Sequence, residues 1–162
     1  MELFDIAPRE AWQALLDGVR ERTGMTATCY NAAGEVVIRH EAWANALCPR
    51  IQENTEARTT VCAVAQQVLG KQAMATGEPQ VDECDVGMIK FAVPIVVGGD
   101  VVGTIGACGG RDPDVEVETF LAAQLLDTTE EALAEDAAGV PTVAEAKVTE
   151  AVAYLQAELA KL

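Results

Sequence analysis

The sequence predicts an α+β fold built on an antiparallel central sheet, and three observations support this class. Half of the 162 residues are hydrophobic, which is enough for a domain with a real core. The apolar, β-rich runs 89–97 and 101–108 flank Gly98-Gly99-Asp100, a connection with hairpin chemistry. Segments with helical periodicity lie between the hairpins and after them, so we expect strands to pair mainly with their chain neighbours.

The N-terminal part of the chain predicts a helix followed by a hairpin. Apolar side chains recur on one face of residues 8–23, where Pro8 suits the first turn and Gly24 suits the stop. Residues 25–31 and 35–40 have the composition of two strands around a turn.

The middle of the chain predicts a long helix, a short strand and the central hairpin. Asn54 is a suitable N-cap for a helix that ends near Gly77, and its wide apolar band indicates packing against a sheet. Residues 79–84 form the short strand. Pro94 lies inside the first strand of the central hairpin, which favours an edge position or a bulge there.

The last third of the chain predicts two helices. Asp112-Pro113 has the chemistry of a helix start, and this helix is expected to run to Ala138. Thr142 and Glu145 have capping-box spacing for a final helix. Apolar residues recur there at spacings of four and three, at Val148, Val152, Leu155, Leu159 and Leu162.

This final seam is two heptads long, which fits packing on the domain and homodimerisation through residues 142–162 equally well. We therefore divide the chain into a domain at 1–138 and a C-terminal helical segment at 139–162.

The charge of the chain excludes several classes of partner. The formal net charge is −15, and residues 111–162 hold 12 acidic and 3 basic residues. This balance opposes direct binding to nucleic acid or to anionic lipid. No apolar run reaches membrane-spanning length and the first residues do not form a signal peptide, so we expect a cytoplasmic protein that does not bind membranes.

Catalytic motifs are scarce. The chain has no Ser, which excludes a Ser-His-Asp triad, and its one His, His40, stands outside any motif. We therefore expect a non-catalytic protein. The alternative is a thiol-based redox protein or a cysteine enzyme that uses Cys84. Its acidic neighbours Glu83 and Asp85 oppose this alternative, because they suppress thiolate formation.

Five cysteines are expected to be reduced in the cytoplasm. Three of them, Cys48, Cys62 and Cys84, fall at a helix break, on the long helix and at a strand end. Cys108, on the central hairpin, is a candidate fourth thiolate. Thiolates from such positions can converge on zinc or an iron–sulfur cluster, but their spacing matches no common motif and also fits packed or free thiols.

An ordered set of residues resembles the PocR sensory domain over roughly residues 8–137. The set comprises Leu47-Cys48, Cys62 within a helix, Cys84-Asp85-Val86-Gly87-Met88, Phe91-Ala92-Val93-Pro94-Ile95, Val102-Gly103 and Gly109-Gly110. The resemblance implies a PAS-like or GAF-like ligand-sensing module of bacterial signalling proteins, with helices around the central sheet. It also implies small hydrocarbon derivatives such as diols as ligands, and a separate output protein, since the chain holds only the sensor and a trailing helix.

The resemblance also implies the positions of the sites. Ligand contacts are expected at the turn and on the hairpin, at Cys84, Asp85, Gly87, Met88, Phe91, Pro94, Gly106 and Gly109. Cys48, Cys62 and Cys84 mark the family, so a zinc ion or an iron–sulfur cluster is expected at these three, with Cys108 as the candidate fourth ligand. Two positions depart from the family pattern, with Asp85 in place of a His and Arg111 in place of a Gln.

Overall fold

The computed structural model describes all 162 residues and confirms the α+β class. One five-stranded antiparallel sheet has the order β2-β1-β5-β4-β3. Its strands are β1 (Thr26–Asn31), β2 (Val36–Arg39), β3 (Gln80–Glu83), β4 (Ile89–Val97) and β5 (Asp100–Gly110). The central hairpin of β4 and β5 is therefore the middle of the sheet.

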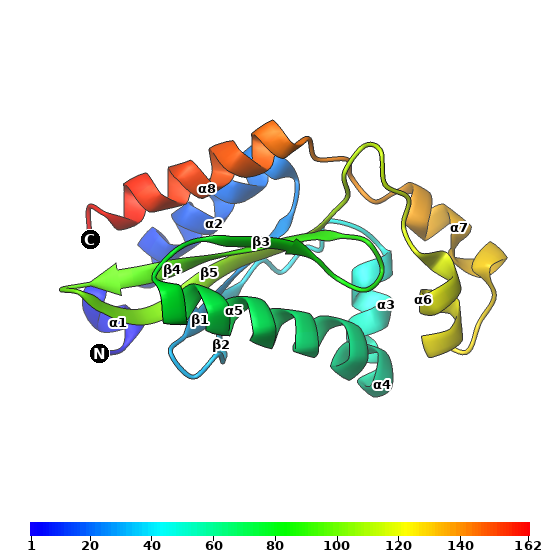
Figure 1. The fold of residues 1–162 in the computed structure, drawn as a ribbon, viewed down its shortest axis with the longest axis horizontal. Coiled ribbons are helices and arrows are strands. Elements are labelled where there is room, and N and C mark those ends of the chain that lie inside the picture. Colours follow the sequence, from blue (N-terminus) through cyan, green and yellow to red (C-terminus); the bar gives the residue numbers. More distant parts are fainter.

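Helices cover both faces of this sheet (Figure 1). They are α1 (Leu3–Ile6), α2 (Arg9–Thr23), α3 (Leu47–Glu53), α4 (Thr55–Ala57), α5 (Val64–Thr76), α6 (Thr119–Leu125), α7 (Glu130–Ala138) and α8 (Glu145–Leu159), with a π-helical segment, η1 (Arg58–Ala63), leading into α5. Helices α2 and α8 lie together on one face, α5 lies on the other, and α6 and α7 stand beyond one end of the sheet.

The main core fills the layer between the sheet and the α2–α8 pair. Strand side chains alternate between faces, so Ile105 of β5 and Phe91 of β4 point into this layer. Trp12 of α2 is fully buried there, and its indole N–H donates to the carbonyl oxygens of Leu3 and Ala7 at 3.0 and 3.1 Å. The short helix α1 is thereby fixed to α2.

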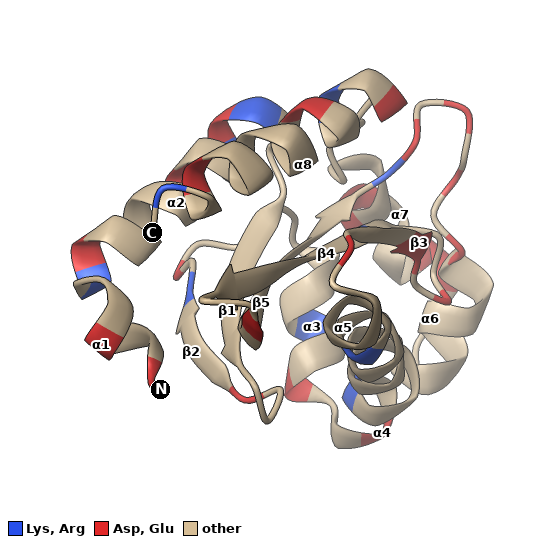
Figure 2. Cartoon of the chain, turned by 60° about the vertical axis from the view of Figure 1, so that its left-hand side comes forward, with Lys and Arg blue, Asp and Glu red and all other residues tan.

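A second, smaller core lies at the end of the sheet where α3, α6 and α7 meet. Leu47 of α3, Met88 before β4 and Leu133 of α7 are all buried in it. This cluster attaches the acid-rich C-terminal third to the sheet. Asp and Glu are spread over the helices and over the loop that precedes α6 (Figure 2).

Several local signals in the sequence are confirmed. Gly24 ends α2 in the left-handed region with φ 71°, and the side chain of Asn54 accepts from the Ala57 N–H as an N-cap. Gly98 and Gly99 both have positive φ, as a two-residue hairpin turn requires. Pro94 lies beyond the end of β3, whose pairing stops at Gln80 and Ala92, so no neighbouring strand needs its missing N–H on that side.

Two predictions about the last third are wrong. The helix expected over 112–138 is divided, because residues 112–118 form a loop and a second break separates α6 from α7. Thr142 does not cap α8. It forms an isolated parallel bridge with Arg111, and the helix begins after Ala144. In both places contacts between distant segments replace the local capping chemistry, since Glu118 donates its N–H to the Val86 carbonyl oxygen and Val143 donates its N–H to that of Arg111.

The apolar seam of the last helix faces the domain. Val148, Leu155 and Leu159 are buried in the main core, whereas Leu162 is 46% exposed. Tyr154 of the same helix lies against Gly18 of α2, where a Cβ atom would collide with its ring. Helix α8 is therefore packed against α2 and β4 over its length.

Candidate ligand-binding site

A cavity of about 220 Å³ lies between the sheet and the helical layer that contains α5. Its walls come from strands, helices and two loops. The lining residues are Thr26, Thr28, Tyr30, Gly34, Arg39, Trp43, Gln52, Arg58, Cys62, Ala63, Gln66, Gln67, Lys90 and Cys108.

The sheet side of the cavity follows from strand alternation. Thr26, Thr28 and Tyr30 are every second residue of β1, so they share the face opposite the main core. Cys108 of β5 pairs with Thr26 on one side and with Lys90 of β4 on the other. Three adjacent strands thus place a hydroxyl, a thiol and an ammonium in one row.

The helical side is formed by the π-helical segment and the start of α5. Arg58, Cys62 and Ala63 lie within η1, and Gln66 follows on α5. A π-helical turn accommodates an extra residue in a helix and often occurs at functional sites. The long apolar band of this helix is evident in the sequence, but the irregular turn within it has no sequence signal that we could identify.

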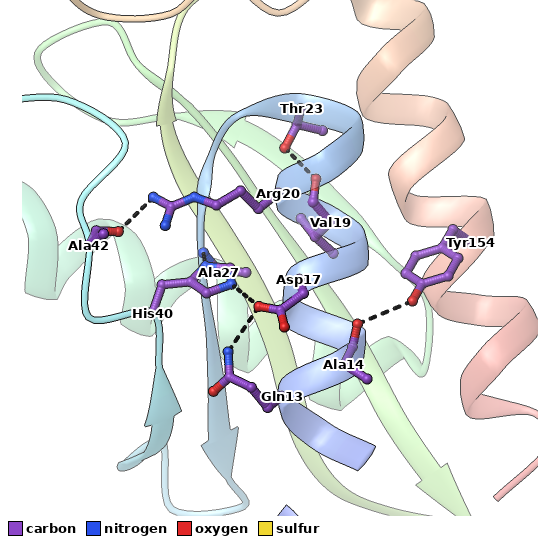
Figure 3. A network of polar contacts seen from close by, with 10 residues as sticks. All are labelled: Gln13, Ala14, Asp17, Val19, Arg20, Thr23, Ala27, His40, Ala42 and Tyr154. Atoms are coloured by element: carbon purple, nitrogen blue, oxygen red, sulfur yellow. Dashed lines mark hydrogen bonds and ion pairs between the residues drawn. The ribbon is translucent and has the colours of Figure 1, made fainter. Parts of the chain in front are cut away.

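The loop after β2 supplies an aromatic wall. Trp43 is partly buried, and the guanidinium of Arg39 lies 5.3 Å from the centre of its ring. Figure 3 shows how α2 holds this loop, since the Arg20 guanidinium donates to the Ala42 carbonyl oxygen at 2.6 Å. The Ala44 N–H donates to the Thr26 hydroxyl at 2.8 Å, which ties the other side of the loop to β1.

The charges of the lining are all positive. Arg39, Arg58 and Lys90 line the cavity and no Asp or Glu does, in a chain with a net charge of −15. Lys90 is only 5% exposed. Burial raises the pKa of Tyr30 to about 12, so its hydroxyl remains a hydrogen-bond donor at neutral pH.

Four of the five thiols lie near one another at this end of the sheet. Burial is the main cause that raises the pKa values of Cys48, Cys62 and Cys84. They are therefore protonated and weakly nucleophilic at neutral pH. Cys29 is separate, because it points into the main core on the other face.

Asn45 contacts Cys48 through both ends of its side-chain amide. Its side-chain carbonyl accepts from the N–H groups of Leu47 and Cys48 at 2.9 and 2.8 Å, at the start of α3. Its amide N–H₂ donates to the Gly109 carbonyl oxygen at 2.9 Å and contacts the Cys48 sulfur at 3.3 Å. The Cys48 thiol in turn lies 3.6 Å from the Met88 sulfur.

The thiols do not form a ready metal site as their side chains lie. Nowhere in the chain do three or more His, Cys, Asp or Glu side chains converge closely enough to hold a metal ion. A shared zinc ion or cluster would therefore require these side chains to turn toward one another.

The structure distributes the predicted ligand residues around the cavity, and none of the eight lines it. Phe91 points to the opposite face, into the main core. Asp85 is exposed at the turn, while Met88 and Gly109 lie beside Asn45. Gly106 lies under the cavity, because a Cβ there would be 3.4 Å from both Tyr30 and Gln66, which line it.

The remaining predicted residues have other surroundings. Cys84 and Gly87 belong to the turn between β3 and β4, where the Gly87 N–H donates to the Cys84 carbonyl oxygen at 2.8 Å. Pro94 is buried farther along β4, opposite Thr104 of β5. Of the four predicted metal ligands, Cys62 and Cys108 line the cavity.

The polar lining residues are not among the ligand residues expected from the sequence, because each belongs to a segment whose pattern is explained by an ordinary strand or helix. The alternation of Thr26, Thr28 and Tyr30 along one strand was the available signal. A lysine inside the apolar run 89–97 was a second one, since Lys90 is the sole charged residue of that run.

A sheet with helices on both faces and a polar-lined cavity under one helical layer is the organisation of a small-molecule sensing domain. The family model described as the sensory domain found in PocR matches residues 5–161, and the chain belongs to this family. The match includes α8, whose side chains complete the main core. The comparison with curated proteins gave no match.

Solved structures with a similar fold have low sequence identity to this chain. A GAF domain/HD domain protein from Geobacter sulfurreducens is 12% identical with a TM-score of 0.47, over 93% of this chain and 88% of that one. The C-terminal domain of a putative transcriptional regulator from Vibrio cholerae is 10% identical with a TM-score of 0.44, over 94% of each chain.

No helix of this protein has the length and apolar character needed to cross a bilayer.

Proposed function

We propose that this protein senses a small molecule by binding it in the cavity between β1, β4, β5 and the η1–α5 helix, without catalysing a reaction. The observation that carries the proposal is the cavity itself, a partly open space that is lined by polar groups from strands, helices and loops. His40 lies outside this lining, and burial raises the pKa values of Cys62 within it and of Cys84 at the nearby turn, so neither of these thiols is an activated nucleophile. This also weighs against the alternative of a cysteine enzyme.

Filling the cavity should abolish ligand binding. Ala63 lines the cavity, so Ala63→Phe should occupy its space, whereas Val64→Phe adds a ring at the next position, where the side chain is 53% exposed. The wild-type protein is screened by thermal unfolding against small diols, alcohols, amides and carboxylates. A compound at one hundred times its dissociation constant should stabilise the wild type by about 2.7 kcal/mol.

We expect Val64→Phe to retain this stabilisation and Ala63→Phe to lose it, with both variants folded by circular dichroism. Intrinsic tryptophan fluorescence gives an independent signal, because Trp43 lies in the cavity wall. A ligand that stabilises Ala63→Phe as strongly as the wild type would place binding elsewhere and disprove the assignment.

We further propose, as a separate point, that Cys48, Cys62, Cys84 and Cys108 bind zinc or an iron–sulfur cluster once their side chains reorient. Two observations support this: Cys62 and Cys108 line the same cavity, and Cys48, Cys62 and Cys84 pack against the same core cluster. Such a group would hold the turn before β4, the helix and β5 together.

Metal content by mass spectrometry and absorbance of protein purified without oxygen checks this proposal. One metal ion or cluster per chain, lost in Cys48→Ala and retained in Cys29→Ala, is the expected result. Metal-free protein in which all these thiols titrate freely would eliminate the proposal, while leaving the cavity assignment intact.

A further inference from the structure

We infer that the ligand of the cavity is a small organic anion, which is bound by the positive charges of the lining, with the buried Lys90 as the principal one. This inference rests on the proposed function, because it specifies the chemical class of ligand for the same cavity. It starts from an imbalance of charge. The chain has 26 acidic and 11 basic residues, yet the cavity is lined by three basic residues and no acidic one.

Lys90 is the central observation. Its side chain lies on the cavity face of β4, in the middle of the sheet, and the residue is 5% exposed. An ammonium group has three donors, and the one hydrogen bond that Lys90 makes goes to the Cys62 carbonyl oxygen at 3.4 Å. Burying an ammonium group with so few partners is costly unless a negative charge comes to it.

No carboxylate of the protein takes that role. Asp82 is opposite Lys90 on β3, but it is exposed and its carboxylate accepts from the Glu83 N–H at 2.8 Å. The Lys and Arg residues that do form ion pairs with Asp or Glu within 4.0 Å all lie outside the cavity, at Arg22, Arg50, Lys147 and Lys161. The cations of the lining are therefore left for a ligand.

The remaining lining favours an organic anion over an inorganic one. Arg39 presents its guanidinium beside the Trp43 ring, and Tyr30 adds a second aromatic wall. Aromatic walls can contact the apolar part of an organic ligand. A guanidinium group can bind the carboxylate of such a ligand with two hydrogen bonds. The cavity volume of about 220 Å³ is small, which favours a small acid.

The test compares acids with neutral compounds of the same shape. Isothermal titration measures the binding of sodium butyrate and sodium benzoate against butyramide and benzamide, with sodium sulfate as the inorganic probe and 1,2-propanediol as the neutral diol. The proteins are the full chain and its variants Lys90→Met, Arg39→Gln, Lys71→Met and Asp82→Asn. Lys71 is an exposed lysine outside this cavity, so Lys71→Met controls for the change of net charge.

We expect the wild type to bind at least one of the two acids about tenfold or more tightly than its amide, because hydrogen bonds to charged groups are the stronger ones. Lys90→Met and Arg39→Gln should each weaken acid binding by about tenfold to a hundredfold with little effect on the amide. Lys71→Met and Asp82→Asn should bind the acid as the wild type does. Lys90→Met should also unfold at a higher temperature than the wild type when no ligand is added, since it removes a buried charge.

Three outcomes with the organic probes would overturn the inference. They are equal binding of acid and amide, preference for the diol, and no binding of either acid at a probe concentration of about 10 mM. In the second case Ala63→Phe would still abolish diol binding, so the cavity would remain the sensing site and the anionic class alone would fail. Binding of sulfate without either organic acid would likewise exclude an organic anion.

Discussion

At the residue scale, His40 shows how burial determines the role of a titratable side chain. It follows β2 and is buried, although nothing in its sequence context indicates that. Its Nδ1 accepts from the Ala27 N–H at 3.0 Å, so the proton is on Nε2, which donates to Asp17 Oδ1 at 3.1 Å (Figure 3). This neutral tautomer connects α2 to the edge of the sheet and has a structural role.

His40 should make stability depend on pH. Burial lowers its pKa in the folded protein below the ordinary value of 6.5, although the hydrogen bond with Asp17 partly opposes this. Between the two pKa values the unfolded chain binds more protons, so the free energy of unfolding should decrease as pH falls below about 6.5. The full contribution of the group is present above that pH.

Urea unfolding of the wild type and of His40→Asn between pH 5 and 8 measures this contribution. Asn retains an acceptor for the Ala27 N–H but does not titrate, so the variant should lose less stability toward low pH. His40→Ala leaves the buried N–H unpaired and should cost about 1–3 kcal/mol at pH 8. Parallel pH profiles for the wild type and His40→Asn would show that His40 does not titrate differently on folding.

At the element scale, α8 shows what a periodic pattern does and does not determine. The spacing of its apolar residues predicts a helix with one apolar stripe, and that is confirmed. The identity of the covering surface is a separate question, which the contacts with α2 and β4 answer for the isolated chain. Arg22 reinforces the packing, because its guanidinium lies 3.9 Å from the centre of the Tyr154 ring.

Leu155→Ala should lower the free energy of unfolding by about 2–5 kcal/mol, because it opens a space in the main core. Leu155 is fully buried, whereas Leu162, the last residue of the same seam, is 46% exposed. Leu162→Ala is therefore the matched control and should cost less than about 0.5 kcal/mol. Chemical denaturation checks both values.

The same measurement addresses the predicted homodimer. If the seam is used in the core, the unfolding midpoint of the wild type is independent of protein concentration. A midpoint that rises with concentration, together with a Leu155→Ala variant that is monomeric but fully stable, would assign the seam to a dimer interface.

The other elements also differ in whether local sequence signals or contacts between distant segments determine them. Helix α2 and the β4–β5 hairpin could be predicted closely, because their signals are local: an apolar period, a left-handed glycine stop, and two glycines in a turn. The division between α6 and α7 could not, because residues 112–118 extend along the end of the sheet. There, the Glu118 N–H donates to the Val86 carbonyl oxygen at 2.9 Å, which is a contact between distant segments.

At the scale of the whole molecule, the sheet separates two layers with different tasks. One layer holds the main core with α2 and α8, and the other holds the cavity under η1 and α5. Strand alternation makes this separation possible, since Phe91 and Lys90 are adjacent in sequence and face opposite layers. The ligand residues expected from the sequence lie in the turn before β4 and on the central hairpin, outside the cavity lining, and their contact with a ligand stays a prediction.

The sequence by itself determined the α+β class, the central hairpin, most of the helices and the membership of a sensory family, because these depend on local periodicity, turn chemistry and ordered motifs. The tertiary structure alone decided which side chains share the cavity. Thr26, Lys90 and Cys108 come from three strands and form a row through the register of β1, β5 and β4. Strand register is a long-range property, so the alternation in β1 and the single lysine of β4 do not by themselves show that these side chains share one cavity.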